Sequence, residues 1–278
     1  MPIRIVQSKQ NARLKELRRV LTNPGRISSG LVGIEGPHLI HEAMRAGLDI
    51  ECIFAGERMQ HWVETSGLSK DTEVLILPSG ILSSILSTET PQPVAALVKS
   101  PDWAWTNVLN RVAKTPALIL VLAAIQDPGN LGTISRSAEA FGASGVICLP
   151  GTVNPWNQKA VRASAGSVFR MPMLSIGESE TLEQLHKAGV HVLTTSVQGA
   201  QPAAHVDLTG PVAFVIGNEG NGVPAELAAK TDGAVTIPCP GPVESLNAAV
   251  AASVLLYEAA RQRSVRSAGL TVSHGGPQ

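Results

Sequence analysis

The chain has 278 residues, enough for two domains of ordinary size that each bury a core. Apolar residues make up 44% and aromatic residues only 3%, so those cores must be aliphatic. Lysine plus arginine and aspartate plus glutamate each number 22, so the whole-chain charge gives no sign of a nucleic-acid partner.

No apolar run reaches the roughly 18 residues that a membrane-spanning helix needs. The first residues, Met1-Pro2-Ile3-Arg4, lack the features of a signal peptide. The cysteines Cys52, Cys148 and Cys239 are far apart and form no CxxC pair, which argues against a metal site and favours reduced thiols. We therefore expect a cytoplasmic protein that holds no metal and inserts in no membrane.

The first 26 residues are locally basic. Apolar residues recur at helical spacing over 11–22, and Asn23-Pro24-Gly25 should end that helix. A single acid, Glu16, stands against the basic residues Arg4, Lys9, Arg13, Lys15, Arg18, Arg19 and Arg26. Such a helix either follows RNA phosphates or presents a solvated face, and its charge leaves both interpretations open.

Strand and helix patterns alternate over the next segment and predict a small α/β domain at 1–100. The expected strands are 31–34, 50–54, 74–77 and 94–98, and the expected helices are 38–46 and 79–86. Residues 101–115 contain Pro101, Trp103 and Trp105 and match neither period, so we expect a linker there.

A second alternation predicts another α/β domain at 116–264, followed by a disordered tail at 265–278. The expected strands are 117–122, 145–149, 191–195, 212–216 and 234–237, and the expected helices are 131–141, 178–188, 224–231 and 246–263. The last helix is apolar nearly all round from 248 to 256, so we expect it to be buried.

Three segments of this domain follow predicted strands, and the carboxyl ends of strands are where open α/β sheets bind ligands. The first is QDPGNLGTISR at 126–136, in which Asn130 is well placed to cap a helix that carries Arg136. A capped helix with a surface arginine is the plainer interpretation of the same residues.

The second segment is IGNEGNG at 216–222. Its glycines indicate a backbone with positive φ or in close contact with a ligand. A phosphate-binding loop is disfavoured because the GK[ST] ending is missing and Glu219 would repel an anion.

The third segment is IPCPGPVESLN at 237–247, which places Ser245 and Asn247 at the start of the last helix. Either residue has an ordinary alternative role as a helix cap. No GxGxxG pattern is present, which disfavours a nicotinamide enzyme.

In this order and spacing, the stretches NLGTISR (130–136), IGNEGNG (216–222), IP (237–238) and ESLNAA (244–249) resemble the motifs of the SpoU (TrmH) family of RNA 2′-O-methyltransferases, in the SPOUT superfamily. KAVRASAGS (159–167) also resembles a family segment. The similarity covers about 117–263, and EGPHLIHEA (35–43) is similar to the family's substrate-binding domain.

The resemblance implies an α/β fold, with a C-terminal α/β-knot (SPOUT) methyltransferase domain preceded by a small RNA-docking domain. It implies S-adenosylmethionine as cofactor, held by the backbone around Thr195, Gly217, Ile237 and Leu246. It also implies an RNA substrate, most simply ribosomal RNA, and a homodimer whose active site uses both subunits.

By the same resemblance, Arg136 would activate the ribose 2′-hydroxyl, while Asn130, Glu219, Ser245 and Asn247 would orient the reactants. Because arginine is normally fixed in its cationic form, stabilising the developing alkoxide is a simpler role than acting as a base. Lys159 and Arg162 are candidates for phosphate contacts, and a plain surface role is an equal alternative for Lys159.

Four other functions fit parts of the pattern. A tRNA ribose methyltransferase would have the same motifs, as would an antibiotic-resistance methyltransferase that modifies the ribosome. A non-catalytic RNA-binding protein could use the same scaffold, although the family's site residues are retained. A small-molecule nucleotide enzyme fits least, because the glycine-rich loop carries Glu219 and no lysine.

Overall fold

The computed structural model describes residues 1–24, 30–86, 91–109, 115–196, 199–218, 220–243 and 245–267. The chain forms two compact units. Unit 1 contains Met1–Asp102 and Asn154–Arg170, and unit 2 contains Trp103–Val153 and Met171–Gln278. Residues 154–170, which lie inside the second predicted domain, therefore fold with unit 1.

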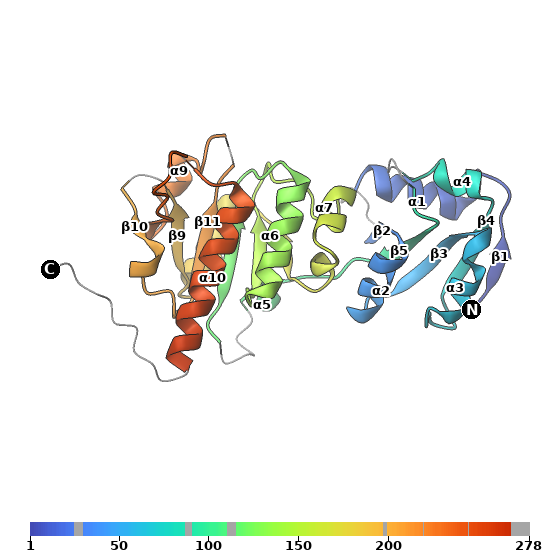
Figure 1. Cartoon of the computed structure of the whole chain (residues 1–278), viewed down its shortest axis with the longest axis horizontal. Helices are drawn as coiled ribbons and strands as arrows, with labels where there is room; N and C mark the ends of the chain where they lie inside the picture. The colour runs from blue at the N-terminus through green and yellow to red at the C-terminus, as the bar shows by residue number, and fades with distance from the viewer. Residues whose placement is uncertain are drawn as a thin grey trace. The chain divides into compact units, whose positions relative to one another are not determined.

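Unit 1 contains a 5-stranded mixed sheet in the order β1-β4-β3-β5-β2 (Figure 1). β1, β4 and β3 run parallel, whereas β5 is antiparallel to both β3 and β2. The strands are β1 (Ile3–Ile5), β2 (Leu31–Glu35), β3 (Ile50–Gly56), β4 (Glu73–Leu77) and β5 (Val94–Lys99). The edge strand β1 was not predicted, because it has only three residues and its isoleucines are exposed and give no burial pattern.

Short helices complete unit 1. They are α1 (Ala12–Thr22), α2 (Pro37–Arg45), α3 (Gln60–Thr65), α4 (Ser79–Ser83) and α7 (Gln158–Ala163), with 3₁₀ turns at Glu57–Met59 and Ser167–Phe169. The α1 helix begins where the side chain of Asn11 accepts hydrogen bonds from the amides of Arg13 and Leu14. The predicted helix at 79–86 ends earlier, at Ser83.

The basic face expected on α1 is only partly available to a ligand. Arg13 forms ion pairs with Glu16, Glu51 and Glu73 at 3.1–3.3 Å. Because it joins the helix to the sheet, we assign it to the fold. The remaining basic side chains of the helix, Lys15, Arg18 and Arg19, are exposed.

Unit 2 is built on a 7-stranded sheet in the order β10-β12-β9-β11-β6-β7-β8, and all its strand pairs are parallel. The strands are β6 (Leu118–Leu122), β7 (Gly145–Cys148), β8 (Met173–Ser175), β9 (His191–Thr195), β10 (Gln201–Pro202), β11 (Val212–Ile216) and β12 (Gly233–Thr236). The central strands β6 and β11 are apolar and buried at every position, as expected for strands covered on both faces.

The helices of unit 2 are α5 (Trp105–Val108), α6 (Pro128–Ala140), α8 (Glu178–Lys187), α9 (Ala225–Ala228) and α10 (Ala248–Ser267), with a 3₁₀ turn at Ala203–His205. Residues 101–115 were expected to be a linker, but α5 falls within them. The α10 helix extends to Ser267, which corrects the expected start of the tail at 265. The rest of that tail, 268–278, lies outside the described residues.

The α10 helix packs along α6 and over β11 (Figure 1). Its inner side chains, including Ala252, Leu255 and Leu256, are fully buried. In contrast, Val250 and Tyr257 are 48% and 55% exposed, so the expectation of a buried helix is right for only one of its faces. Among the described helices, none combines the length and apolarity needed to cross a membrane.

Candidate functional site

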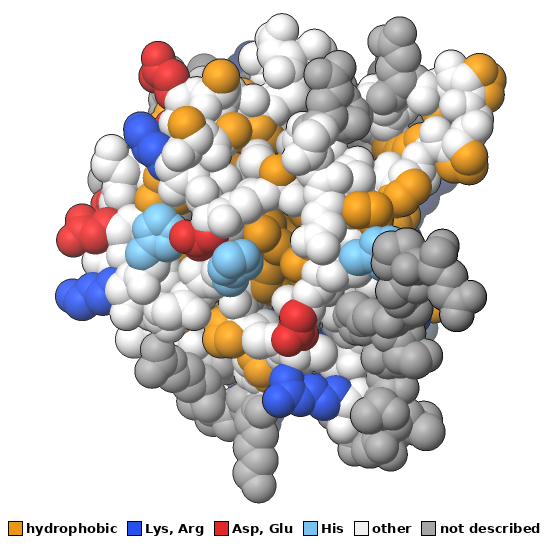
Figure 2. All heavy atoms as spheres, turned by 90° about the vertical axis from the view of Figure 1, so that its left-hand side faces the viewer, with side chains coloured by type: hydrophobic (Ala, Val, Ile, Leu, Met, Phe, Trp, Pro, Cys, Tyr) orange, Lys and Arg blue, Asp and Glu red, His pale blue; other side chains and the backbone are white. Residues whose placement is uncertain are grey.

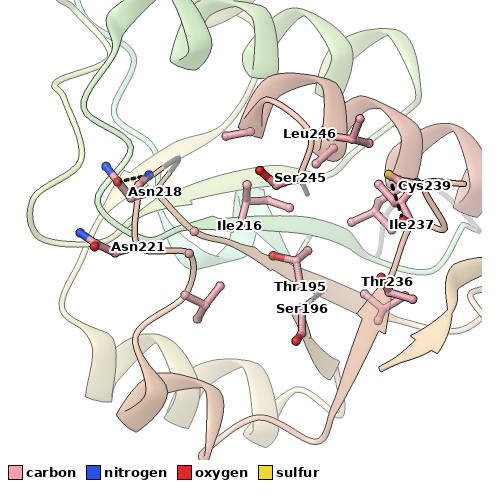
Figure 3. Close-up of a pocket in the computed structure, with 18 residues that line it drawn as sticks. Thr195, Ser196, Ile216, Asn218, Asn221, Thr236, Ile237, Cys239, Ser245 and Leu246 are labelled. Atoms are coloured by element: carbon pink, nitrogen blue, oxygen red, sulfur yellow. Dashed lines mark hydrogen bonds between the residues drawn. The ribbon is translucent and has the colours of Figure 1, made fainter. Parts of the chain in front are cut away.

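Three loops enclose a cavity of about 460 Å³ at the carboxyl ends of β9, β11 and β12 (Figure 3). These strands are neighbours in the sheet and run parallel, so their loops meet at one edge. The lining residues are Thr195, Ser196, Ile216, Gly217, Asn218, Gly220, Asn221, Gly222, Val223, Val235, Thr236, Ile237, Cys239, Ser245, Leu246, Ala248, Ala251 and Leu255.

The loop after β11 folds back on itself. The amide of Gly222 donates to the carbonyl of Asn218 at 2.8 Å, and a Cβ on Gly217 would lie only 2.1 Å from the carbonyl carbon of Gly222. The Asn218 side chain donates to the carbonyl of Ala124 at 3.0 Å and accepts from the amide of Gly220 at 2.8 Å. Asn218 therefore fixes the loop to the end of β6, and only glycine fits at 217.

The loop after β12 closes the cavity from the other side. Figure 3 shows Ser245 and Leu246 in the loop just before α10, across from Thr195 at the end of β9. The Thr195 hydroxyl donates to the carbonyl of Val215 at 2.9 Å, which ties β9 to β11. Among the described lining residues none is charged, so the cavity offers hydroxyl, amide, thiol and apolar groups.

Polar side chains join the first turns of α6 and α10 beside this cavity. Asn247 donates from Nδ2 to Oδ1 of Asn130 at 3.1 Å. The Oδ1 of Asn247 accepts from the amides of Ala249 and Val250 at 2.9 and 3.3 Å, so this residue also caps α10. Asn247 therefore caps the helix, as its ordinary structural role predicts, and also links the motif at 244–249 to the motif at 130–136.

The predicted cap of α6 is wrong by three residues. Asp127 is the N-cap, and its carboxylate accepts from the amide of Asn130 at 3.0 Å. The reason is Pro128, which lacks an amide hydrogen and fits the first position of a helix. Asn130 consequently lies within the first turn, where its side chain can reach Asn247.

Arg136 lies on the exposed side of α6 and is absent from the described residues that line the cavity. No hydrogen bond or ion pair to a described residue occupies its guanidinium. Among the described residues it is therefore an unpaired cation, on the helix that packs against α10.

The structure thus gathers most of the predicted site. The four predicted cofactor residues, Thr195, Gly217, Ile237 and Leu246, line the cavity together with Ser245. Asn130 and Asn247 meet each other, Arg136 stands apart, and Glu219 lies outside the described residues.

Asn218 and Cys239 were not predicted as site residues, although both lie inside the segments 216–222 and 237–247. The signal for Asn218 was its place between the glycines of a tight loop, where an amide side chain can satisfy backbone groups. Cys239 follows Ile237 by two residues, and its thiol contacts the carbonyl of Ile237 at 3.4 Å.

The other two cysteines take no part in the site. Burial raises the pKa of Cys52 and of Cys148 to about 12, so both thiols stay protonated at neutral pH. The described residues form no cluster of histidine, cysteine or acidic side chains that would bind a metal.

Two family models match the chain in succession. One, described as an MRM3-like substrate binding domain, matches residues 11–96. The other, described as the SpoU rRNA Methylase family, matches residues 117–257.

Curated relatives are similar over most of the chain. The 23S rRNA (guanosine(2553)-2′-O)-methyltransferase RlmP of Bacillus subtilis is 32% identical over 252 residues, which cover 91% of this chain and 97% of that protein. The 23S rRNA (guanosine-2′-O-)-methyltransferase RlmB of Coxiella burnetii is 34% identical over 211 residues, which cover 74% and 84%.

Solved structures agree over nearly the whole length. The SpoU methyltransferase AviRb from Streptomyces viridochromogenes, in complex with the cofactor AdoMet, has a TM-score of 0.81 at 29% identity and covers 92% of this chain and 99% of its own. The AdoMet-bound rRNA methyltransferase from Sinorhizobium meliloti has a TM-score of 0.80 at 29% identity, with coverage of 93% and 98%.

Proposed function

This chain belongs to the SpoU rRNA methylase family, and we propose from that membership that it transfers the methyl group of S-adenosylmethionine to a ribose 2′-hydroxyl of ribosomal RNA. The family confirms the expected fold class, an α/β-knot methyltransferase domain preceded by a small α/β substrate-binding domain. The observation that carries the proposal is the single cavity lined by all four residues expected to hold the cofactor.

The cavity suits S-adenosylmethionine in size and in backbone geometry. Its volume of about 460 Å³ lies within the range of roughly 300–1,000 Å³ typical of small-molecule sites. The loop at Gly217 leaves no room for a Cβ, and Thr195 and Ser245 contribute hydroxyl groups. When bound, S-adenosylmethionine supplies an electrophilic methyl group on a sulfonium sulfur.

Arg136 is the residue that we assign to the acceptor. A ribose hydroxyl is a poor nucleophile until its proton leaves, and a fixed positive charge beside the oxygen stabilises the alkoxide that develops. The guanidinium acts through its charge, because arginine does not release its proton under ordinary conditions.

Asn130, Asn247 and Ser245 orient the reactants at this site. Asn247 caps α10 and holds Asn130, so the hydrogen bond between them fixes the start of α10, next to Ser245, against α6, which bears Arg136. We retain Glu219 as a fourth orienting residue on the strength of the motif that surrounds it.

A homodimer completes the site in this proposal. The exposed face of α10 and the neighbouring face of α6 form an apolar groove, lined by Thr133, Phe141, Ala249, Val250, Ser253, Val254 and Tyr257. Leaving Val250, Val254 and Tyr257 in water is unfavourable, since burying apolar surface contributes about 25 cal/mol per Å². A second copy docked there would contact α6, the helix that carries Arg136. The described lining of the cavity within one chain contains no arginine, so the partner subunit can contribute one to the site.

The RNA enters the proposal through unit 1. Residues 11–96 match the substrate-binding model, and the exposed face of α1 presents Lys15, Arg18 and Arg19. Both curated relatives described above act on 23S rRNA by name, which favours ribosomal RNA over tRNA as the substrate.

Two measurements on the purified full chain test this function. Calorimetric titration with S-adenosylmethionine should show one site per chain. Incubation with donor labelled in the methyl group should label ribosomal RNA. Binding without transfer to any RNA would instead support a non-catalytic RNA-binding protein, and no binding at all would refute the assignment of the cavity.

A further inference from the structure

A segment of 17 residues leaves unit 2 and folds as part of unit 1. Residues 154–170 lie within the range matched by the methylase model, yet they form one compact unit with the substrate-binding residues. The segment contains α7 and the 3₁₀ turn Ser167–Phe169.

One anchor is a buried hydrogen bond to the sheet of unit 1. The side chain of Gln158, only 8% exposed, donates from Nε2 to the carbonyl of Gly33 in β2 at 2.8 Å. A buried carbonyl that loses its donor costs about 1–3 kcal/mol, so this bond fixes the first turn of α7 against β2.

A second anchor lies at the other end of the segment. Arg170 donates to the carboxylate of Glu42 on α2 at 2.9 Å, and Gly166 approaches the same residue so closely that a Cβ would lie 2.7 Å from Cβ of Glu42. Burial alone would raise the pKa of the Glu42 carboxyl, but the hydrogen bonds and charges of Arg170 and Arg45 outweigh it and lower the pKa. Glu42 is therefore ionised and paired at neutral pH.

Between these anchors the segment presents positive charge and no acid. It contains no aspartate or glutamate, and its basic residues are Lys159, Arg162 and Arg170. Arg170 is neutralised by Glu42, whereas Arg162 is exposed on α7 and pairs with no carboxylate of the described chain.

The face of unit 2 in Figure 2 has a different charge pattern. There the described blue and red side chains are scattered among one another and form no basic patch, and Lys230 pairs with Glu178 at 2.8 Å. Two histidines on unit 2, His186 and His191, flank Asp232. A cation that is already paired with a carboxylate attracts a polyanion only weakly, whereas the unpaired charge of Arg162 is available to a phosphate.

We infer that Arg162 binds a phosphate of the RNA as part of the substrate-binding unit, and that Gln158 and the Glu42–Arg170 pair are positioning residues that hold it there. The inference rests on the proposed function, since it takes RNA as the substrate. Arg162 lies in the range matched by the methylase model, yet it would belong to the RNA-docking surface. The RNA contacts made by unit 1 would therefore extend beyond residues 11–96.

The test measures the affinity of the full chain for a ribosomal RNA fragment over a series of salt concentrations. Replacing one phosphate contact changes the slope of log affinity against log salt by about 0.7–0.9. Arg162→Gln should weaken binding several-fold at low salt and reduce the slope by that amount. The control Lys230→Gln removes a cation that is already paired and should leave both values unchanged.

Gln158→Leu separates a positioning role from a merely structural one. It should weaken RNA binding as Arg162→Gln does, and the double variant should be no weaker than either single variant. Additive losses would show that Gln158 does not act through Arg162. An unchanged salt slope for Arg162→Gln would overturn the phosphate contact itself.

The same samples distinguish this inference from the proposed function. If the native chain binds S-adenosylmethionine and methylates RNA while the Arg162 variant keeps the native salt slope, only the inference fails. If the native chain neither binds the donor nor modifies RNA, the proposed function fails first.

Discussion

Arg136 carries a permanent charge without a described partner, and it lies on α6, the helix that packs against α10. If it stabilises the developing alkoxide, Arg136→Ala should lower kcat by about 10²–10³-fold, the loss typical of one oxyanion-stabilising donor. The affinity for S-adenosylmethionine should stay within about twofold of native, because the described lining of the cavity does not include Arg136. Single-turnover kinetics and calorimetry measure the two quantities. Turnover at the native rate would refute the role.

Replacing Gly217 by alanine adds one methyl group to the wall of the cavity and so tests whether that wall binds the donor. Gly217→Ala would place a Cβ 2.1 Å from the carbonyl carbon of Gly222, so the loop must open and donor affinity should fall at least about tenfold. Gly241→Ala is the matched control, since a Cβ there meets no atom within 4 Å. Equal affinities of the two variants in calorimetric titration would contradict the assigned cavity.

At the residue scale, the motifs allowed most of the site to be predicted. Glycines with tight spacing and polar residues after strands mark backbone that approaches a ligand, and these residues line the cavity. The position of Arg136 outside that lining could not be predicted. A sequence gives its helix and its face, but it does not show whether a neighbouring loop or another subunit reaches the guanidinium.

At the scale of elements, Arg263 fixes the C-terminal half of α10. Its guanidinium donates to four carbonyls, those of Pro116, Ala117, Leu208 and Gly210, at 2.7–3.1 Å. Burial lowers the pKa of Arg263, yet an arginine remains charged at neutral pH, and these bonds are charge-assisted.

Arg263→Gln should therefore destabilise unit 2 by about 2 kcal/mol, since a neutral amide cannot supply the same donors. For a domain of this size the expected drop in Tm is roughly 4–8 °C in differential scanning calorimetry. Arg266→Gln removes a guanidinium that donates to the hydroxyl of Thr209 at 2.6 Å, and it should lower Tm far less. Equal Tm values for the two variants would show that α10 is held elsewhere.

Elements with a clear apolar pattern were predictable, and some short elements without such a pattern were not. Periodicity located β9 and β11 to the residue, because both carry uninterrupted strand-forming residues. It missed β1 and α7, which have three and six residues. It also placed the start of α6 too late, because the cap follows from Pro128 rather than from the apolar spacing.

At the scale of the whole molecule, the exposed groove on α6 and α10 predicts self-association. Val254→Asp would place a charge in the groove and should convert a dimer into a monomer in sedimentation or light scattering. Ile5→Asp is the control, an equally apolar and more exposed position on the edge strand of unit 1, and should leave the mass unchanged. A native chain that is monomeric at micromolar concentration would contradict the dimer.

Val254→Asp also tests whether the active site uses residues from both subunits. If the partner subunit supplies Arg136, a monomeric Val254→Asp chain should still bind S-adenosylmethionine but lose methyl transfer. A monomer with native turnover would show that one chain contains the complete site.

Ribose methylation can be mapped directly, because a 2′-O-methyl group blocks alkaline cleavage of the RNA backbone at the next phosphate. The most direct test compares ribosomal RNA and tRNA from cells with the native chain, with Arg136→Ala, and without the gene. We predict a protected ribose in ribosomal RNA that appears only with the native chain. A methyl group found only in tRNA, on a base, or in no RNA would contradict it.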